Sequence, residues 1–269
     1  MSETPRTEAR NPRAAGLAEA TTAEILALMN DEDATVAVAV RGALPDIGRA
    51  VDAIVSALAA GGHVRYVGAG TSGRLGVLDA SEAPPTFGVA PDLFHGIIAG
   101  GDGALRSAIE GAEDSADAGG ADLAAVLAPH DVVVGLSASG RAPYVLGALD
   151  AARSRGLETV GVTCVAGSAL ARAAAIPIVV DVGPEIIAGS SRLKAGTATK
   201  LVLNMLSTAA MIRSGRTKGD LMIDVRATNE KLRARAIGIV RDELGVDEAD
   251  ARARLEACEW SVRRAIAPR

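Results

Sequence analysis

Aromatic side chains are scarce in this chain of 269 residues, which contains two Phe, two Tyr and one Trp. These rings are too few to line a carbohydrate groove or to form a platform on which nucleic-acid bases stack. The hydrophobic fraction is nevertheless 49%, so the core must be built from Ala, Val, Leu and Ile. A binding site made of backbone amides, hydroxyl groups and carboxylates remains compatible with this composition.

Cysteine, histidine and positive charge are also limited. The two cysteines, Cys164 and Cys258, cannot form a disulfide framework or a thiolate zinc site, and we expect them to be buried and unreactive. The three histidines lack the spacing of metal ligands, so we expect no metal. The net charge of -5 disfavours nucleic-acid binding, which requires a basic surface.

Long hydrophobic runs are missing as well. The chain has no apolar run of about 18 residues, the length that a membrane span requires. Residues 1–12 are polar and do not contain the apolar centre of a signal peptide. We therefore expect a soluble, cytoplasmic protein that does not enter a membrane.

Helical patterns follow a polar start. Residues 1–16 are expected to form an arm that is either mobile or docked on a partner. A first helix should begin at the capping box Thr21-Thr-Ala-Glu24 and end at the acidic residues 30–33. A second helix should start near Pro45, because apolar residues recur at helical spacing after it.

Short β-rich runs alternate with helical patterns between residues 61 and 228. The predicted strands are 63–67, 93–98, 131–136, 158–164 and 176–180, and the clearest helices are 143–155 and 194–214. This alternation predicts an α/β fold, in which right-handed crossovers pair the strands in parallel and helices cover both faces of the sheet. We expect three parts: N-terminal arm and helices (1–60), α/β domain (61–228) and a small C-terminal helical domain (229–269).

Three loops that combine glycine with hydroxyl groups each open a predicted helix, at residues 68–74, 137–141 and 189–194. Because a helix N-terminus offers free N–H groups and the positive end of a dipole, such loops suit an anion. The first loop matches GxGxxG, but Asp102 lies beyond the position where a dinucleotide site has its acidic residue. One such loop can be a tight turn without a ligand, whereas three indicate a phosphorylated small molecule. The candidate binding residues are Gly70, Thr71, Ser72, Arg74, Ser137, Ser139, Gly140, Arg141, Ser190, Ser191 and Lys194.

Three carboxylates are candidates for proton transfer. Glu82 precedes Pro84-Pro85 and is expected at the C-terminal end of the helix that the first loop opens. Burial there would raise its pKa, which suits an acid or a base. Glu113 lies in an acidic helical stretch, and Glu185 precedes the third loop and is placed to line the same pocket. The residue pattern alone does not choose among them.

Several motifs resemble a known family, the N-acetylmuramic acid 6-phosphate etherases. They are residues 68–88 (Gly-Ala-Gly-Thr-Ser-Gly-Arg-Leu-Gly-Val-Leu-Asp-Ala-Ser-Glu-Ala-Pro-Pro-Thr-Phe-Gly), 112–114, 137–141, 189–200 and 224–230. The similarity begins at about Thr7-Glu8 and covers nearly the whole chain. This family belongs to the sugar isomerase (SIS) domain proteins, so the resemblance implies a flavodoxin-like three-layer sandwich and a homodimer with sites near the subunit interface.

The resemblance also implies a reaction. It is cleavage of the D-lactyl ether of N-acetylmuramate 6-phosphate, by elimination and then addition of water, within peptidoglycan sugar recycling. The products are N-acetylglucosamine 6-phosphate and D-lactate, and no cofactor is required. Carried over from the family, Glu82 becomes the acid that protonates the departing lactate and Glu113 the base at C2. The runner-up interpretations are a non-catalytic sugar-phosphate-binding regulator and a SIS-type aldose–ketose isomerase.

The chain departs from the family pattern in three places. Ala142 stands where SIS phosphate loops commonly have Thr, so one hydroxyl donor is missing. Ala83 stands where Cys is common. Related chains continue for some tens of residues beyond the point matching Arg269, so we expect a C-terminal bundle that is incomplete or that folds without its last helix.

Overall fold

The fold is built around a parallel five-stranded sheet with the strand order β2-β1-β3-β4-β5. The computed structural model describes residues 6–225, 227 and 229–267. The strands are β1 (Val64–Gly68), β2 (Phe94–Ile98), β3 (Val132–Leu136), β4 (Glu158–Thr163) and β5 (Ile176–Val179). The α/β class and the parallel sheet predicted from the sequence are therefore confirmed.

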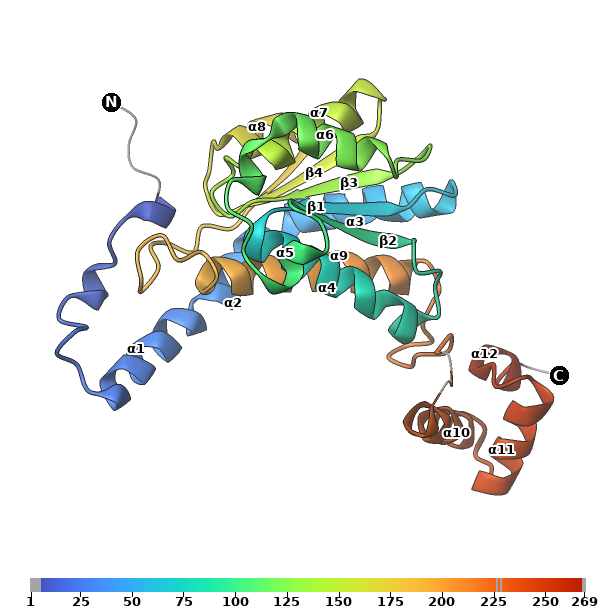
Figure 1. The fold of residues 1–269 in the computed structure, drawn as a ribbon. Coiled ribbons are helices and arrows are strands. Elements are labelled where there is room, and N and C mark those ends of the chain that lie inside the picture. Colours follow the sequence, from blue (N-terminus) through green and yellow to red (C-terminus); the bar gives the residue numbers. More distant parts are fainter. Residues whose placement is uncertain (1–5, 226, 228, 268–269) are drawn as a thin grey trace.

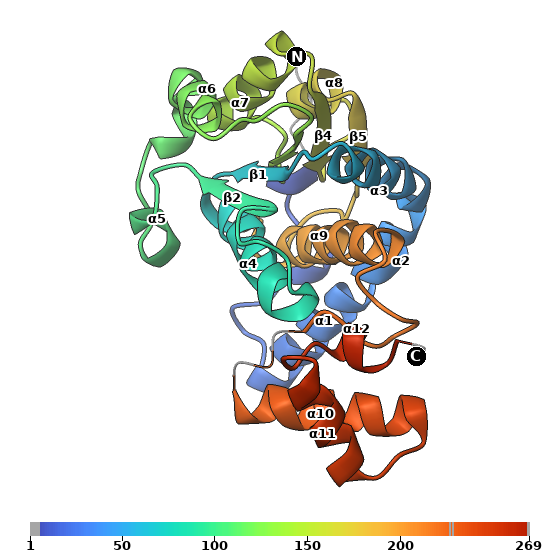
Figure 2. The ribbon, with the colours of Figure 1, turned by 90° about the vertical axis from the view of Figure 1, so that its right-hand side faces the viewer.

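Helices cover both faces of the sheet, which gives three layers (Figures 1 and 2). On one face lie α2 (Val36–Gly42), α3 (Leu44–Ala59), α4 (Gly70–Phe87) and α9 (Lys194–Arg213), and on the other lie α6 (Ala116–Ala124), α7 (Pro143–Ser154) and α8 (Ala169–Ala173). Successive residues of a strand point to opposite faces, so Val132 and Val134 of β3 join the first core and Val133 the second. This double burial explains why β3 is a continuous apolar run.

The first helix begins and ends where the sequence predicts. Helix α1 (Thr22–Ala34) begins with the predicted capping box, in which Thr21 and Glu24 satisfy each other's backbone N–H groups. It ends at Ala34, directly after the acidic residues 30–33, as predicted, and Glu32 within these residues is buried against Lys194. Two short 3-10 turns, Arg6–Glu8 and Pro12–Ala14, precede α1.

Helix α4 runs through the two prolines that were expected to end it. Pro84 and Pro85 lie in its last turns, and the helix ends at Phe87 with Gly88 in the left-handed conformation (φ 65°). Glu82 therefore lies inside the helix and is exposed rather than buried.

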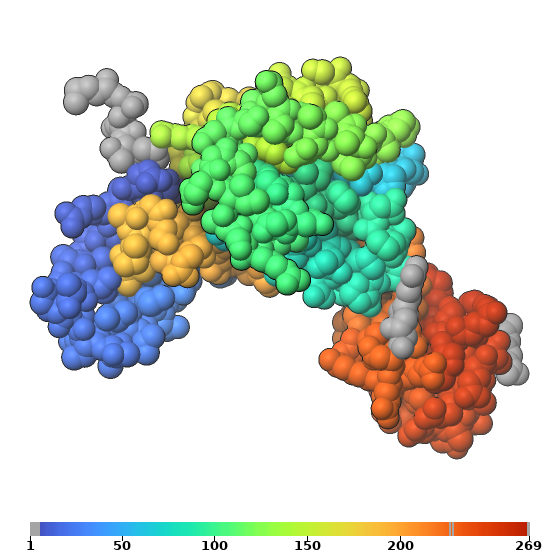
Figure 3. Space-filling model, viewed as in Figure 1, coloured from blue at the N-terminus to red at the C-terminus, as the bar shows by residue number. Residues whose placement is uncertain are grey.

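The C-terminal helices form a small cluster of their own, apart from the sheet (Figure 1). They are α10 (Glu230–Leu244), α11 (Glu248–Ala257) and α12 (Val262–Ala265). Ile223 and Val225 join their apolar core, and Arg263 anchors α12 to Asp224 at 2.6 Å. The space-filling view places this cluster and α1 at opposite ends of the molecule (Figure 3).

The remaining helical segments connect β2 to α6. They are α5 (Gly103–Arg106) and the 3-10 turn Ala112–Asp114. Within the described part of the chain, every helix is too short or too polar to cross a bilayer. Cys164 is buried as expected, and burial raises the pKa of its thiol to about 12.

Candidate active site

The carboxyl ends of β1 and β3 mark the point where the order of the sheet reverses. β1 is followed by α4 and leads to β2 on one side, whereas β3 is followed by α7 and leads to β4 on the other. Loops that leave such a switch point in opposite directions create a crevice in which doubly wound α/β proteins bind ligands. The fold therefore specifies where a site should lie before any side chain is considered.

A cavity of about 250 Å³ occupies this crevice, and we call it the Glu113 cavity. Its wall combines the hydroxyl-rich loops with Glu113 and with the start of the chain. The sequence-predicted residues on its wall are Gly70, Thr71, Ser72, Glu113, Ser137, Ser139 and Ser191. The other lining residues are Thr7, Glu8, Ala69, Leu136, Ala138, Ala142 and Gly189.

The N-terminus of α4 opens directly onto this cavity. Ala69 is its N-cap residue and provides no side-chain hydrogen bond to the first turn. Gly73 allows the sharp turn from β1 into α4, because a Cβ there would lie 2.7 Å from the carbonyl oxygen of Gly68. The first N–H groups of α4 are thus held next to Thr71 and Ser72, an arrangement that suits an anion.

The second loop is held in place by packing against its neighbours. Gly140 has φ 64°, and a Cβ on it would lie 2.2 Å from Oγ of Ser168. Gly140 therefore supports the loop from behind, while Ser137 and Ser139 face the Glu113 cavity. Ala142, where a hydroxyl is missing, also lies on the cavity wall and is the N-cap residue of α7.

Three predicted residues lie away from the cavity. Arg74 donates from Nε to the carbonyl oxygen of Leu105 at 3.3 Å. Arg141 lines a different cavity of about 440 Å³, together with Arg172 and Asp181. The backbone N–H of Ser190 donates to the carbonyl oxygen of Ile187, within the loop itself.

Glu185 and Lys194 have structural partners instead of a place on the cavity wall. The carboxylate of Glu185 is 1% exposed and accepts the N–H groups of Lys194 at 3.0 Å and Ala195 at 2.9 Å. It thereby occupies the N-terminus of α9, which the sequence assigned to the ligand. Lys194 is also buried, and its ammonium group lies 2.5 Å from Oε2 of Glu32.

Glu32 links this buried pair to the N-terminal segment. It also accepts hydrogen bonds from Asn11 at 2.9 Å and from Arg13 at 3.0 Å. Burial acts to raise the pKa of Glu32, but the hydrogen bond and positive charge of Lys194, helped by Asn11 and Arg13, outweigh it and lower the pKa. The charged carboxylate is therefore part of the fold.

The two glutamates expected to transfer protons lie apart within one chain. Glu113 is exposed on the wall of the cavity, in the turn that precedes α6. Glu82 follows Gly70 by twelve residues along α4, which corresponds to about 18 Å of helix. One chain thus provides one of the two carboxylates to the Glu113 cavity.

Thr7 and Glu8 line the cavity although no loop motif pointed to them. The carbonyl oxygen of Thr7 accepts the N–H of Gly189 at 3.2 Å, and Arg6 pairs with Asp181 at 2.5 Å. The described part of the N-terminal arm, residues 6–16, therefore contacts its own chain. The available signal in the sequence was that the family resemblance begins at Thr7-Glu8.

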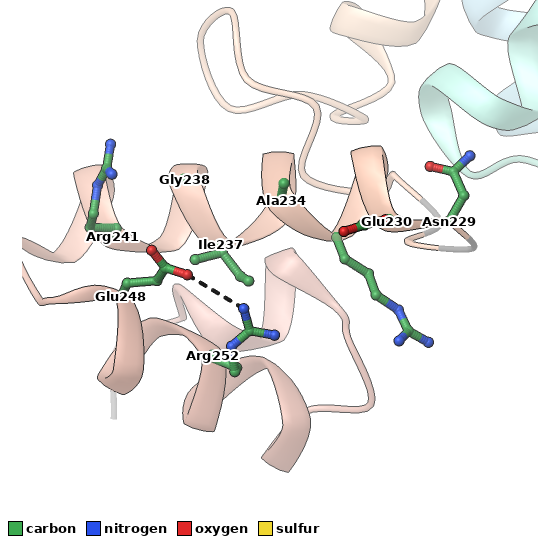
Figure 4. Close-up of a pocket in the computed structure, with 9 residues that line it drawn as sticks. Asn229, Glu230, Ala234, Ile237, Gly238, Arg241, Glu248 and Arg252 are labelled. Carbon is green, nitrogen blue, oxygen red and sulfur yellow. Dashed lines mark hydrogen bonds and ion pairs between the residues drawn. The ribbon is translucent and has the colours of Figure 1, made fainter.

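A second hollow, of about 640 Å³, lies far from these loops, between α10 and α11. Figure 4 shows that Ile237 points between the two helices, while Arg252 donates to Glu248 (3.4 Å). Arg233 and Arg241 also line it, and none of the predicted site residues does. Exposed charged side chains on a short helical pair do not position a substrate, so we place the candidate active site at the Glu113 cavity.

Comparisons with known proteins identify relatives of this chain. The model of the glucokinase regulatory protein N-terminal SIS domain matches residues 46–153, and that of the SIS domain matches residues 112–209. An N-acetylmuramic acid 6-phosphate etherase of Escherichia fergusonii is 52% identical over 261 residues, which cover 97% of this chain and 88% of that protein.

Solved structures show the same fold at low sequence identity. A phosphoheptose isomerase from Francisella tularensis is 21% identical with a TM-score of 0.56, over 71% of this chain and 98% of that chain. A protein of Escherichia coli CFT073 in complex with A5P is 18% identical with a TM-score of 0.53, over 75% and 97%. The SIS-type fold is therefore established for the central part of this chain.

Proposed function

The chain belongs to the N-acetylmuramic acid 6-phosphate etherase family, and we propose that it cleaves the D-lactyl ether of N-acetylmuramate 6-phosphate. The products are N-acetylglucosamine 6-phosphate and D-lactate. The observation that supports this most directly is the Glu113 cavity, where hydroxyl-bearing loops and a helix N-terminus adjoin the carboxylate of Glu113. We place the reaction in the cytoplasm, within the recycling of peptidoglycan sugars.

The reaction requires proton transfer at two positions of the sugar. In the open-chain form, the proton on C2 is acidic because it is adjacent to the aldehyde. A base removes this proton, and the lactyl oxygen leaves C3 with a proton from an acid. Water then adds to C3 of the unsaturated aldehyde, and a proton returns to C2. The C2–H electron pair forms the C2–C3 double bond, the C3–O pair leaves with lactate, and water supplies the pair of the new C3–O bond. The sequence involves no net oxidation or reduction, so it requires proton transfers, which the two carboxylates can perform.

Glu113 is the proposed base. It lines the same cavity as the loops that would hold the phosphate, so the carbon chain of a sugar anchored by these loops would lie near the carboxylate. The phosphate oxygens would accept hydrogen bonds from Thr71, Ser72, Ser137 and Ser139 and from the N-terminus of α4. A general base of this kind contributes about 10²–10⁴-fold to the rate.

We propose that a second copy of the chain completes the site with its own Glu82. A cavity of about 250 Å³ is small for a whole sugar phosphate with a lactyl group, since ligand sites usually exceed about 300 Å³. Leu78 lies one turn before Glu82 on α4 and is 52% exposed, as expected of a helix face that a neighbour covers. The assembly is then a homodimer in which each site takes Glu113 from one chain and Glu82 from the other.

The activity is tested by incubating the protein with N-acetylmuramate 6-phosphate and measuring D-lactate. In water labelled with heavy oxygen, the label should appear on C3 of N-acetylglucosamine 6-phosphate, because the C3–O bond is the one that breaks. Label in lactate instead would contradict the elimination mechanism. Binding of sugar phosphates without lactate release would favour the regulator, a candidate supported by the match to the glucokinase regulatory protein domain over residues 46–153.

The shared site is tested by mixing two inactive variants, Glu82→Ala and Glu113→Ala, under conditions that exchange subunits. If each site combines the two chains, half of the dimers carry one intact site, and activity returns to about a quarter of the wild-type value. If both glutamates act within one chain, every site of a mixed dimer lacks one carboxylate and activity stays absent. Each variant kept unmixed is the control.

We propose that the chain divides into N-terminal helices, a central α/β domain and a C-terminal helical unit, and that the central domain carries the site. Because Ile223 and Val225 pack with α10 and α12, we propose that the C-terminal unit begins near residue 221 rather than 229. Helices α2 and α3 share the core of the sheet, so we propose that they fold together with it.

A further inference from the structure

Thr7 contains a buried hydroxyl group without a hydrogen-bond partner. The residue is 3% exposed, and its Oγ1 has no partner among the residues that the structure describes. Other buried polar groups are well satisfied: Asp79, for example, accepts from Tyr66, Asn204 and Ser207. Since an unpaired buried hydroxyl destabilises a fold, its presence requires an explanation.

The position of Thr7 provides that explanation. Thr7 lies on the wall of the Glu113 cavity, and the segment around it is fixed on both sides. Arg6 pairs with Asp181, and the side chain of Asn11 donates to the carbonyl oxygen of Pro184 at 3.3 Å. Thr7 is thus a cavity-lining residue whose hydroxyl hydrogen is unused, and this hydrogen is available for a ligand that fills the cavity.

Glu8 lies on the same wall and also lacks a partner. No hydrogen bond or ion pair within 4.0 Å is found for its carboxylate in the described part of the chain. Its Oε2 is positioned over Gly189, where an added Cβ would lie 3.0 Å away. A carboxylate repels phosphate, so its natural partner in a sugar phosphate is a neutral donor, either a hydroxyl or an amide N–H.

We propose that Thr7 and Glu8 are substrate-contacting residues, and that the N-terminal segment determines specificity for the sugar. The Thr7 hydroxyl donates to an oxygen of the substrate, and the Glu8 carboxylate accepts from a sugar hydroxyl or the acetamido N–H. This inference rests on the proposed function only in taking the ligand to be an N-acetylated sugar phosphate. Both residues come from the same chain as Glu113.

The role of Thr7 is tested with Thr7→Val, which keeps the shape of the side chain and removes the hydroxyl. Thr7→Ser keeps the hydroxyl, and Thr22→Val makes the same change on the exposed first turn of α1. Calorimetry measures the affinity of each protein for N-acetylglucosamine 6-phosphate, and the lactate assay separates KM from kcat. Thermal unfolding without ligand reports on stability.

We expect Thr7→Val to weaken binding and raise KM about tenfold, which corresponds to ~1.4 kcal/mol. Its melting temperature without ligand should be unchanged or higher, because the variant removes an unsatisfied hydroxyl. Thr7→Ser and Thr22→Val should bind like the wild type. A Thr7→Val protein with wild-type affinity and KM, or one that loses stability but not affinity, would overturn the proposal.

The role of Glu8 is tested with Glu8→Gln, with Glu19→Gln as a control for the same charge change on an exposed turn. We expect Glu8→Gln to weaken binding of N-acetylglucosamine 6-phosphate at least several-fold, while inorganic phosphate binds equally well or more tightly. Equal affinity of Glu8→Gln and the wild type for the sugar phosphate would contradict the role of Glu8. If the wild type binds the sugar phosphate but releases no lactate, the proposed reaction fails, and these binding measurements still decide the role of the segment.

Discussion

Helices α4 and α9 begin in similar loops, yet their N-termini differ in what they can bind. Both loops combine glycine with hydroxyl groups, and a Cβ on Gly196 of α9 would lie 3.6 Å from Thr71 of α4. The first turn of α9 is already capped by the buried carboxylate of Glu185, whereas Ala69 leaves the first turn of α4 without a side-chain cap. An anion that enters the crevice therefore finds free N–H groups at α4, whereas at α9 the N–H groups of Lys194 and Ala195 already donate to Glu185.

The difference shows that a loop motif does not by itself identify a ligand site. Capping groups from elsewhere in the chain determine whether the N–H groups of a helix are available. Glu185 precedes the first turn of α9 by nine residues and reaches it only because the chain folds back after β5. Four substitutions test this difference between the open N-terminus of α4 and the closed N-terminus of α9.

The largest effect is expected at the open site, from Glu113→Gln. Removing the proposed base next to the N-terminus of α4 should reduce lactate release by about 10²–10⁴-fold. The thermal unfolding temperature should stay unchanged, because Glu113 is exposed and its side chain makes no hydrogen bond to the described residues. Glu110→Gln, which changes an exposed glutamate nearby, is the control. Near-normal turnover of Glu113→Gln would remove Glu113 from the mechanism.

At the N-terminus of α9, the expected effect is a loss of stability rather than a loss of activity. Glu185→Ala removes two charge-assisted hydrogen bonds at a buried helix N-terminus and should lower the free energy of unfolding by about 3 kcal/mol. Glu185→Gln keeps an acceptor and should lose less. Because Glu185→Ala opens the N-terminus of α9, added sulfate should stabilise it more than the wild type in urea unfolding. An unchanged unfolding midpoint would show that Glu185 is not the cap that keeps α9 closed.

Much of the difference between the N-termini of α4 and α9 could not be predicted from the sequence. The strands and the helices 143–155 and 194–214 were predictable, because apolar periodicity reflects burial that each segment undergoes on its own. The capping box at Thr21 was equally local. The pairing of Lys194 with Glu32 joins residues 162 positions apart, and no local pattern encodes such a distance.

The residues of the candidate site were likewise predictable only where a local pattern encodes them. Thr71, Ser72, Ser137 and Ser139 were predictable, because they follow strands whose carboxyl ends meet at the switch point of the sheet. The separation of Glu82 from Glu113 was not, because no local pattern shows where the turn that holds Glu113 lies relative to α4. Thr7 and Glu8 were missed because polar residues at the start of a chain have no periodicity to interpret.

The buried pair of Glu32 and Lys194, at the N-terminus of α9, predicts that the free energy of unfolding depends on pH. The pKa of Glu32 in the folded protein lies below its usual value of 4.5. The pair therefore contributes stability that is fully present above about pH 4.5 and is lost as the pH falls through the folded pKa. Lys194→Met should lower the free energy of unfolding by about 2 kcal/mol at pH 7, since Arg13 and Asn11 still contact Glu32.

With Lys194→Met, the free energy of unfolding should also fall less steeply than in the wild type as the pH is lowered. Without Lys194, the pKa of Glu32 rises toward its usual value, so folded and unfolded states bind protons more equally. Urea unfolding between pH 4 and 7 measures this slope, and Lys200→Met, on the exposed side of α9, is the control. Parallel pH profiles for Lys194→Met and the wild type would show that the pair does not contribute to acid sensitivity.

The smallest effect is expected from Ala142→Thr, which adds the hydroxyl that the second loop lacks. Ala142 lines the Glu113 cavity and is also the N-cap residue of α7, so the new hydroxyl has two possible partners. If it caps α7, the free energy of unfolding rises by about 1 kcal/mol and phosphate affinity is unchanged. We expect the other result, tighter phosphate binding by up to about tenfold, because the open N-terminus of α4 already draws the anion to this wall. Calorimetry with inorganic phosphate measures the affinity and urea unfolding the stability. A gain in stability alone would mean that this loop binds phosphate less directly than its hydroxyl groups suggest.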